Sequence, residues 1–177
     1  MKRYVIDIEA DSLDATHIWV VCICDVDNDK DIRSFRDAAS FVAAVDLEKD
    51  TFIAHNGIDF DFPVLEKLWR IEIKNKVDTL VLSRLFNPDR SGGHSLGAWG
   101  ERLGYGKIDF NKFDAYSEEM REYCEQDVYI TVQLYKHLLQ EGVDFSQQSI
   151  ELEHAIADII SRQSRYGFLL IQVKAVS

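Results

Sequence analysis

The sequence predicts an α/β fold in which a mixed, five-stranded central sheet is flanked by helices. Residues 3–10 alternate in the manner of a strand, and residues 18–24 form a nearly unbroken run of β-branched residues and cysteines. A continuous apolar run of this length is typical of a strand buried on both faces. After residue 50 the pattern changes to strand, helix and strand, so the sheet is expected to be mixed.

Polar turns separate the expected strands, and capping residues precede the expected helices. The strands are Arg3–Ala10, Ile18–Cys24, Asp31–Phe35, Thr51–Ala54 and Lys76–Asp78. The first three are expected to be antiparallel, with a charged turn over residues 25–30. The helices are a short one after Asp37, and then 60–69, 79–85, 95–103, 117–140 and about 149–166.

Length and composition fit one domain over residues 1–177, whose last part, from about residue 142, is a C-terminal helix and tail. The three cysteines are odd in number, and the first residues have no signal-peptide pattern. We therefore expect reduced thiols and a cytoplasmic location. No apolar run is long enough to span a bilayer, so no membrane partner is expected.

The charge balance is acidic, with 20 Lys and Arg against 31 Asp and Glu, a formal net charge of -11. Taken alone, this excess argues against a nucleic-acid partner, because Lys and Arg supply most of the affinity for phosphates. Surplus carboxylates can instead hold hard divalent cations. The positions of the acids along the chain therefore matter more than their number.

The first strand carries two carboxylates, Asp7 and Glu9. Residues i and i+2 of a strand project from the same face, so both are aimed the same way, opposite to Ile6 and Ile8. Two acids held together repel one another and raise their pKa values unless a cation or a proton lies between them. The alternative is that this end of the strand is solvated.

A second acid, Asp61, follows the strand Thr51–Ala54 and falls just inside the next helix. In open α/β sheets, ligands bind beyond the carboxyl ends of such strands. The dipeptide Asn56-Gly57 supplies a tight turn before it. Helix capping or dipole compensation is the alternative role for Asp61. Asp59 has the stronger claim to the capping role.

The long helix at residues 117–140 contains Tyr123 and Asp127, which are four residues apart and share one face. Their alternative reading is a half-buried aromatic ring and a surface acid. Four carboxylates without a histidine cluster suit Mg²⁺ or Mn²⁺, and two such ions are the standard arrangement for phosphodiester hydrolysis. Tyr123 would then orient the attacking water, mainly by hydrogen bonding.

These motifs resemble those of the DnaQ-like 3′→5′ exonucleases with four acids and a tyrosine, a superfamily with a ribonuclease-H-like fold. The sequence is most similar to the proofreading domain of short-tailed-phage A-family DNA polymerases. The matching segments are Asp7-Ile8-Glu9-Ala10, His55-Asn56-Gly57, Asp78 to Leu85, Gly93 to Gly104 and Tyr123-x-x-x-Asp127. The resemblance covers about residues 3–168.

The resemblance implies a two-metal 3′→5′ exonuclease that releases nucleoside monophosphates from DNA. It implies that Asp7, Glu9 and Asp127 bind the first ion and that Asp7 also reaches the second. Asp61 would act largely through bound water, and Tyr123 would position the nucleophilic water. The expected cofactors are two ions of Mg²⁺ or Mn²⁺.

For the substrate, the resemblance implies that Glu9 contacts the 3′-hydroxyl and that Leu13 and Phe60 pack around the terminal nucleotide. His55 and Asn56 are further candidates for substrate binding. The expected partner is a single-stranded or frayed 3′ end of DNA. For Asp78 and Arg84, which lie in a well-matched segment, both helix packing and substrate contact stay open.

Residues 153–168 resemble the junction that leads into the polymerase domain. The chain is then a dissected domain or the nuclease subunit of a split polymerase, and in a phage its location is the host cytoplasm. The apolar tail Phe168-Leu169-Leu170-Ile171 would favour a partner or self-association. Two rivals remain, an RNA-trimming exonuclease of the same superfamily and a non-catalytic module that helps a polymerase bind DNA.

Overall fold

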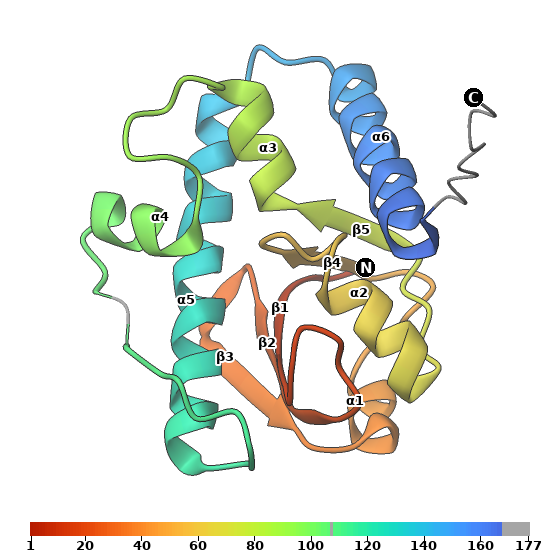
Figure 1. Cartoon of the computed structure of the whole chain (residues 1–177). Coiled ribbons are helices and arrows are strands. Elements are labelled where there is room, and N and C mark those ends of the chain that lie inside the picture. The colour runs from red at the N-terminus through yellow and green to blue at the C-terminus, as the bar shows by residue number, and fades with distance from the viewer. Residues whose placement is uncertain (107, 168–177) are drawn as a thin grey trace, which may run out of the picture.

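The computed structural model describes residues 1–106 and 108–167, which form a five-stranded sheet with helices on both faces (Figure 1). The strands are β1 (Arg3–Ala10), β2 (Ile18–Asp25), β3 (Asn28–Phe35), β4 (Thr51–Ala54) and β5 (Asn75–Asp78). Their order in the sheet is β3-β2-β1-β4-β5. The first three strands are antiparallel, whereas β4 runs parallel to β1 and to β5. The predicted mixed sheet is confirmed, with β1 at its centre.

The helices are α1 (Ala38–Ala44), α2 (Asp61–Val64), the π-helical turn η1 (Leu65–Trp69), α3 (Thr79–Phe86), α4 (Leu96–Leu103), α5 (Glu118–Glu141) and α6 (Gln147–Tyr166). Side chains at the N-cap positions of five of them accept a backbone N–H of the first turn, namely Asp37, Asp78, Ser95, Ser117 and Ser146. Such caps satisfy donors that a helix leaves free. No helix in the described residues is long and apolar enough to cross a membrane.

The structure corrects the expected third strand, which begins at Asn28 and not at Asp31. The chain reverses within Val26 and Asp27, because the carboxylate of Asp25 accepts the backbone N–H of Asp27 at 3.0 Å. A side chain that bonds two residues ahead stabilises a tight turn of this kind. The long charged turn expected over residues 25–30 is therefore wrong.

The helix expected at residues 60–69 is also different. Asp61 begins α2, and the helix widens to a π-helical turn at Leu65. The expectation that Asp59 caps it is wrong, because no side chain caps this end and the Asp59 side chain is exposed. The first turn is held by the backbone, since the N–H of Phe62 donates to the carbonyl of Gly57 at 3.0 Å.

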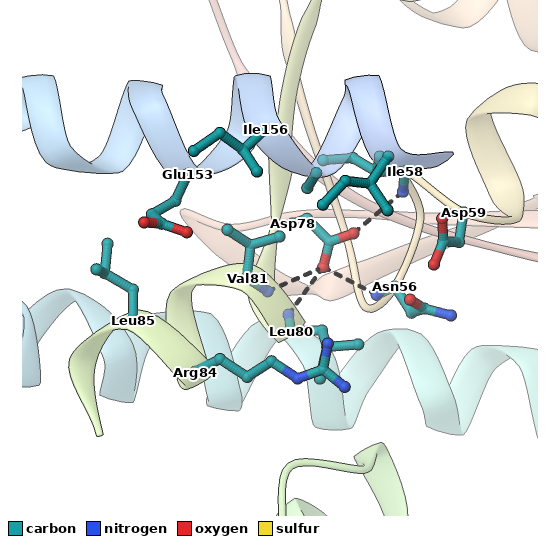
Figure 2. A pocket seen from close by; sticks show the side chains of 12 residues that line it. Asn56, Ile58, Asp59, Asp78, Leu80, Val81, Arg84, Leu85, Glu153 and Ile156 are labelled. Atoms are coloured by element: carbon teal, nitrogen blue, oxygen red, sulfur yellow. Dashed lines mark hydrogen bonds between the residues drawn. The ribbon is translucent and has the colours of Figure 1, made fainter. Parts of the chain in front are cut away.

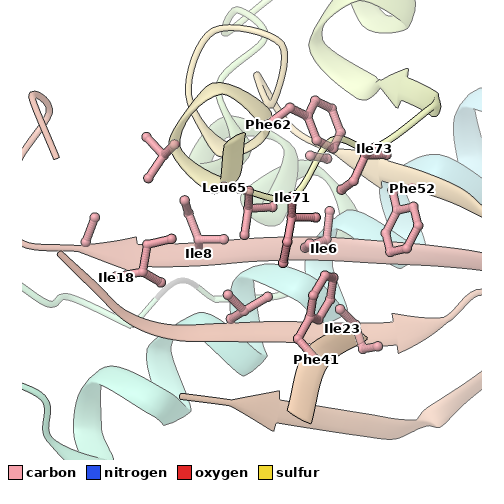
Figure 3. Packing of buried hydrophobic residues seen from close by; sticks show 14 of the residues in the cluster. Ile6, Ile8, Ile18, Ile23, Phe41, Phe52, Phe62, Leu65, Ile71 and Ile73 are labelled. Atoms are coloured by element: carbon pink, nitrogen blue, oxygen red, sulfur yellow. The ribbon is translucent and has the colours of Figure 1, made fainter. Parts of the chain in front are cut away.

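Two apolar layers cover the two faces of the sheet. On one face Ile6 and Ile8 of β1 pack with Phe41, Phe52 and Leu65 (Figure 3). The other face packs under α4 and α5 and includes a fully buried Trp99. Asp7 of β1 pairs with Cys22, which belongs to that second layer. The strand alternation therefore turns the odd-numbered side chains of β1 towards α5.

Helix α6 is tied to the sheet by polar contacts. The backbone N–H of Asp78 donates to Nε2 of His154 at 2.9 Å, while Nδ1 of His154 donates to the carbonyl of Ile150 at 2.8 Å. The hydroxyl of Ser161 donates to the carbonyl of Ile58 at 3.0 Å. These bonds hold α6 beside the loop that follows β4. The apolar tail, residues 168–171, lies outside the described residues.

Two neighbouring leucines of α5 test this packing. Leu138 is fully buried, whereas Leu139 is 46% exposed. We expect Leu138→Ala to lower the free energy of unfolding by about 2 to 5 kcal/mol, because it removes buried methyl groups and leaves a cavity. Leu139→Ala should change it by less than about 0.5 kcal/mol. Urea titration measures both, and equal effects would contradict the packing.

Candidate active site

The central strand β1 places Asp7 and Glu9 on the face that α5 covers. Glu9 is only 6% exposed. The thiol of Cys124, on α5, donates to the carbonyl of Asp7 at 3.5 Å, so the helix lies directly against this part of the strand. The two carboxylates of β1 are thus aimed at α5.

The loop after β4 brings a third carboxylate to the same place. Asp61 is the first residue of α2 and is buried. Its Oδ1 accepts the backbone N–H of Ile8 at 3.2 Å, a bond that joins the start of α2 to the middle of β1. The side chain of Asp61 therefore bonds to β1 between the two acids of that strand.

Helix α5 supplies the fourth carboxylate and the tyrosine. Asp127 is buried, and Tyr123 lies one turn before it and is half-buried. The ring of Tyr123 stacks on Phe110, with ring centroids 5.5 Å apart. The loop that carries Phe110 is held to α5, because Oε1 of Gln126 accepts the backbone N–H of Ile108 at 2.8 Å. Phe110 is a neighbour of the site that the sequence analysis did not single out.

The electrostatics of Asp7 show that the four acids converge. Burial raises the pKa of the Asp7 carboxyl well above its ordinary value. The negative charges of Glu9, Asp61 and Asp127 raise this pKa further, in that order. Charges act on one another in this way only when they are close. The structure therefore brings together the four carboxylates that the sequence predicted.

Burial also raises the pKa of Asp61, to about 7. The nearby charge of Asp78 raises the pKa of Asp61 as well, whereas the backbone N–H groups of Asp61 and Ile8 lower it by stabilising the carboxylate. Without a cation, burial thus favours the protonated form of this carboxyl more than in a free aspartate. The site thus favours a positive charge at its centre.

The donor set fits a hard divalent cation. Oδ2 of Asp7 is buried and has no hydrogen-bond partner among the described residues. Oxygen atoms of Asp7 and Glu9 and the sulfur of Cys124 lie within 4.8 Å of one another. Burial raises the pKa of the Cys124 thiol well above its ordinary value, and carboxylate oxygens are the donors that hard cations prefer.

The predicted substrate residues lie in two neighbouring hollows. Leu13, which is 92% exposed, and Phe60 line a groove of about 930 Å³ beside α2. Asn56 lines a separate pocket between α3 and α6. His55 lies next to it, and its Nδ1 bonds to the hydroxyl of Thr79 at 2.9 Å. Ile58 and Asp59 line both hollows, which therefore adjoin.

Asp78 organises the loop after β4. Its buried carboxylate accepts four backbone N–H groups (Figure 2). The donors are Asn56, Ile58, Leu80 and Val81, at 3.0, 3.1, 2.8 and 3.4 Å. Asp78 thus caps α3 and fixes the loop that leads to Asp61. These bonds give a structural role to a residue for which the sequence left both helix packing and substrate contact possible. Its place directly before a helix was the available signal.

Buried carboxylates gathered beside the central strand of a mixed sheet are the kind of ligand set that metal-dependent phosphodiesterases use. The model of a 3′-5′ exonuclease family, DNA_pol_A_exo1, matches residues 5–142. The chain therefore belongs to this family of 3′-5′ exonuclease domains, whose members are metal-dependent hydrolases.

Two curated relatives are DNA-directed DNA polymerases. The chain is 28% identical to that of Enterobacteria phage T3, over 93% of this chain and 33% of the polymerase. It is 28% identical to that of Escherichia phage T7, over 66% of this chain and 25% of the polymerase. The chain thus matches only a third or a quarter of the length of these relatives.

Similar solved structures confirm the ribonuclease-H-like fold. Brucella melitensis NrnC matches with a TM-score of 0.73 at 20% identity, over 99% of this chain and 91% of NrnC. Escherichia coli RNase D, described as an exoribonuclease involved in structured RNA processing, matches with a TM-score of 0.69 at 16% identity, over 90% of this chain and 45% of RNase D. At these identities the likeness concerns the fold.

The raised pKa of Asp61 predicts how stability depends on pH in EDTA. The folded protein holds this proton more tightly than the unfolded chain, whose carboxyl has a pKa of 3.8. The free energy of unfolding should therefore fall as the pH rises from 4 through 7. The total fall should be about 1.4 kcal/mol for each unit by which the pKa of Asp61 in the folded protein exceeds its pKa in the unfolded chain. Asp61→Asn, which keeps an oxygen for Ile8, should reduce this slope in urea titrations. An unchanged slope would contradict the assignment.

The role of Asp78 predicts a loss of stability on truncation. We expect Asp78→Ala to lower the free energy of unfolding by about 2 to 4 kcal/mol, because it leaves buried N–H groups without an acceptor. The matched control is Asp59→Ala in the same loop, whose exposed carboxylate should matter by less than about 0.5 kcal/mol. Urea titration at neutral pH measures both. Similar values for the two variants would exclude the organising role.

Proposed function

We propose that this chain is a 3′→5′ exonuclease that removes nucleotides from the 3′ end of DNA, as the proofreading part of a phage-type DNA polymerase. The observation that carries the proposal is a buried oxygen of Asp7 that has no hydrogen-bond partner among the described residues, on a carboxyl whose pKa is raised by the charges of three other carboxylates. A fold gains no stability from such repulsion, so the cluster indicates a cation site. The family match and the polymerase relatives support the reaction and its setting.

Asp7, Glu9, Asp61 and Asp127 would hold two ions of Mg²⁺ or Mn²⁺. When bound, such ions activate a water molecule and stabilise the leaving oxygen of a phosphodiester. The Tyr123 hydroxyl would orient that water by a hydrogen bond, and Phe110 fixes its ring. Water adds to the phosphorus, the bond to the 3′-oxygen of the preceding nucleotide breaks, and that oxygen takes a proton.

Leu13 and Phe60 would pack on the terminal nucleotide, since both line the groove beside α2. Glu9 would accept a hydrogen bond from the 3′-hydroxyl. His55 and Asn56, at the start of the loop that follows β4, would make further contacts with the substrate. The remaining acidic excess predicts weak, salt-sensitive binding of DNA away from the site. Tethering to a polymerase domain or subunit, in the cytoplasm of a phage host, would offset this weakness.

A second candidate is an exonuclease that acts on RNA or on short oligonucleotides. The observation that favours it is the match over 90% of the chain of NrnC in a structure described as bound to pGG, together with the exoribonuclease RNase D. The same carboxylates hydrolyse DNA and RNA, so contacts near the sugar 2′ position would decide between them. A non-catalytic module is disfavoured, because it would have no use for a self-repelling cluster.

Digestion of 5′-labelled single-stranded DNA and RNA of the same sequence tests the proposal. With Mg²⁺ or Mn²⁺ we expect shortening from the 3′ end and faster cleavage of DNA. The double variant Asp7→Ala/Glu9→Ala should lose at least about a thousandfold in rate. In EDTA it should be no less stable than the parent, because removing clustered charge relieves repulsion.

Full activity in the double variant would contradict a mechanism that depends on these carboxylates. Faster cleavage of RNA than of DNA would favour the second candidate over the proofreading role. A large fall in the melting temperature of the variant in EDTA would show that the carboxylates serve the fold.

A further inference from the structure

The 108–113 loop is the part of the connection between α4 and α5 that lies along the N-terminal half of α5 (Figure 1). Its residues belong to no helix or strand. Backbone of this kind has no ladder of hydrogen bonds to fix its position, so contacts with neighbouring side chains must do so. The groups that make these contacts therefore decide where the loop lies.

Gln126 of α5 fixes the start of the loop. Its Oε1 accepts the backbone N–H of Ile108 at 2.8 Å, and its Nε2 donates to the carbonyl of Gly106. A side-chain amide that offers both a donor and an acceptor to one stretch of backbone fixes its orientation as well as its distance. Gln126 lies between Tyr123 and Asp127 in the sequence of α5. The loop is thus held to the part of the helix that carries two predicted site residues.

Trp19 of β2 fixes the far end of the loop. Its Nε1 donates to the carbonyl of Phe113 at 2.9 Å. The ring of Phe113 meets the ring of Phe110 edge to face, with centroids 5.1 Å apart and an angle of 89° between the planes. This is one of the geometries that aromatic pairs prefer. Phe110 is therefore supported from the side of the sheet.

The other neighbour of Phe110 is Tyr123. The two rings stack with centroids 5.5 Å apart and planes 27° from parallel. A tyrosine on a helix has more than one staggered side-chain conformation, and each places the hydroxyl at a different point. A ring stacked on one of its faces favours one of these conformations over the others. The 108–113 loop therefore restricts where the Tyr123 hydroxyl lies.

We propose that this loop positions the Tyr123 hydroxyl for catalysis, with Phe110, Gln126 and Trp19 as positioning residues. The inference rests on the proposed function, in which that hydroxyl orients the attacking water. The three residues act through Tyr123 and hold no ion themselves. Ile108 is 40% exposed, and Phe110 is only partly buried at the edge of the apolar layer under α5. The loop thus buries little, and its contact with Tyr123 is its main link to the site.

Truncation of the stacked ring tests this inference. We expect Phe110→Ala to lower the single-turnover cleavage rate at saturating enzyme by about two- to tenfold, the factor that corresponds to one aromatic pair. The substrate is a single-stranded oligonucleotide of whichever sugar type the parent cleaves. The enzyme concentration that gives half the maximal rate should stay unchanged, because the loop holds no part of the substrate. Gln126→Leu, which removes both bonds to the loop, should also lower the rate. The matched control is Asn111→Ala, an exposed residue of the same loop, which should change neither quantity.

A double-mutant cycle separates positioning from a merely structural role. Tyr123→Phe keeps the ring and removes the hydroxyl. If Phe110 acts through that hydroxyl, Phe110→Ala should lower the rate in the parent and cause no further loss in the Tyr123→Phe background. A residue that only supports the fold would lower the rate by the same factor in both backgrounds.

The outcomes distinguish this inference from the proposed function. A parent that cleaves no oligonucleotide with Mg²⁺ or Mn²⁺ overturns the proposed function itself. A parent that cleaves it, with no loss of rate in Phe110→Ala or in Gln126→Leu, overturns only the positioning role of the loop. Equal losses in the two backgrounds of the cycle, or a similar loss in Asn111→Ala, would overturn it as well. Full activity in Tyr123→Phe would also overturn it, because no hydroxyl would then need to be positioned.

Discussion

The mutual repulsion of buried carboxylates around Asp7 is the constraint on which the rest of the structure depends. Burying like charges together disfavours the ionised forms, and their pKa values rise unless a cation balances them. The acids come from β1, α2 and α5, which must be held against one another despite this repulsion. The two apolar layers supply that force, since β1 packs on both its faces. Charge repulsion therefore destabilises the site, and the apolar packing of the surrounding strands and helices holds it together.

The loop after β4 shows how the fold positions one of these acids. Asp78 gathers four N–H groups from the loop and from α3, and its own N–H donates to His154 of α6. One buried residue thus links β5, α3, α6 and the loop that ends at Asp61. Charge-assisted bonds of this kind fix a loop more firmly than apolar contacts do, because each has a preferred direction. The same bonds shape the pocket between α3 and α6.

Composition was a poor guide to function here. A net charge of -11 argues against nucleic acid only if the acids are spread over the surface. Four of them gather at one buried site, where divalent ions would reverse the local sign. The placement of charge along the chain, and not its sum, therefore decides what the acidic excess means.

The sequence by itself determined the sheet, most helix positions and the acids that converge, because alternation, caps and helical spacing are local signals. It misplaced the start of β3 and the capping role of Asp59, where a two-residue turn and backbone bonds decided the local structure. Only the tertiary structure decided the role of Asp78 and the position of α6 beside the loop that follows β4. Both depend on contacts between segments up to 103 residues apart, which no local pattern encodes.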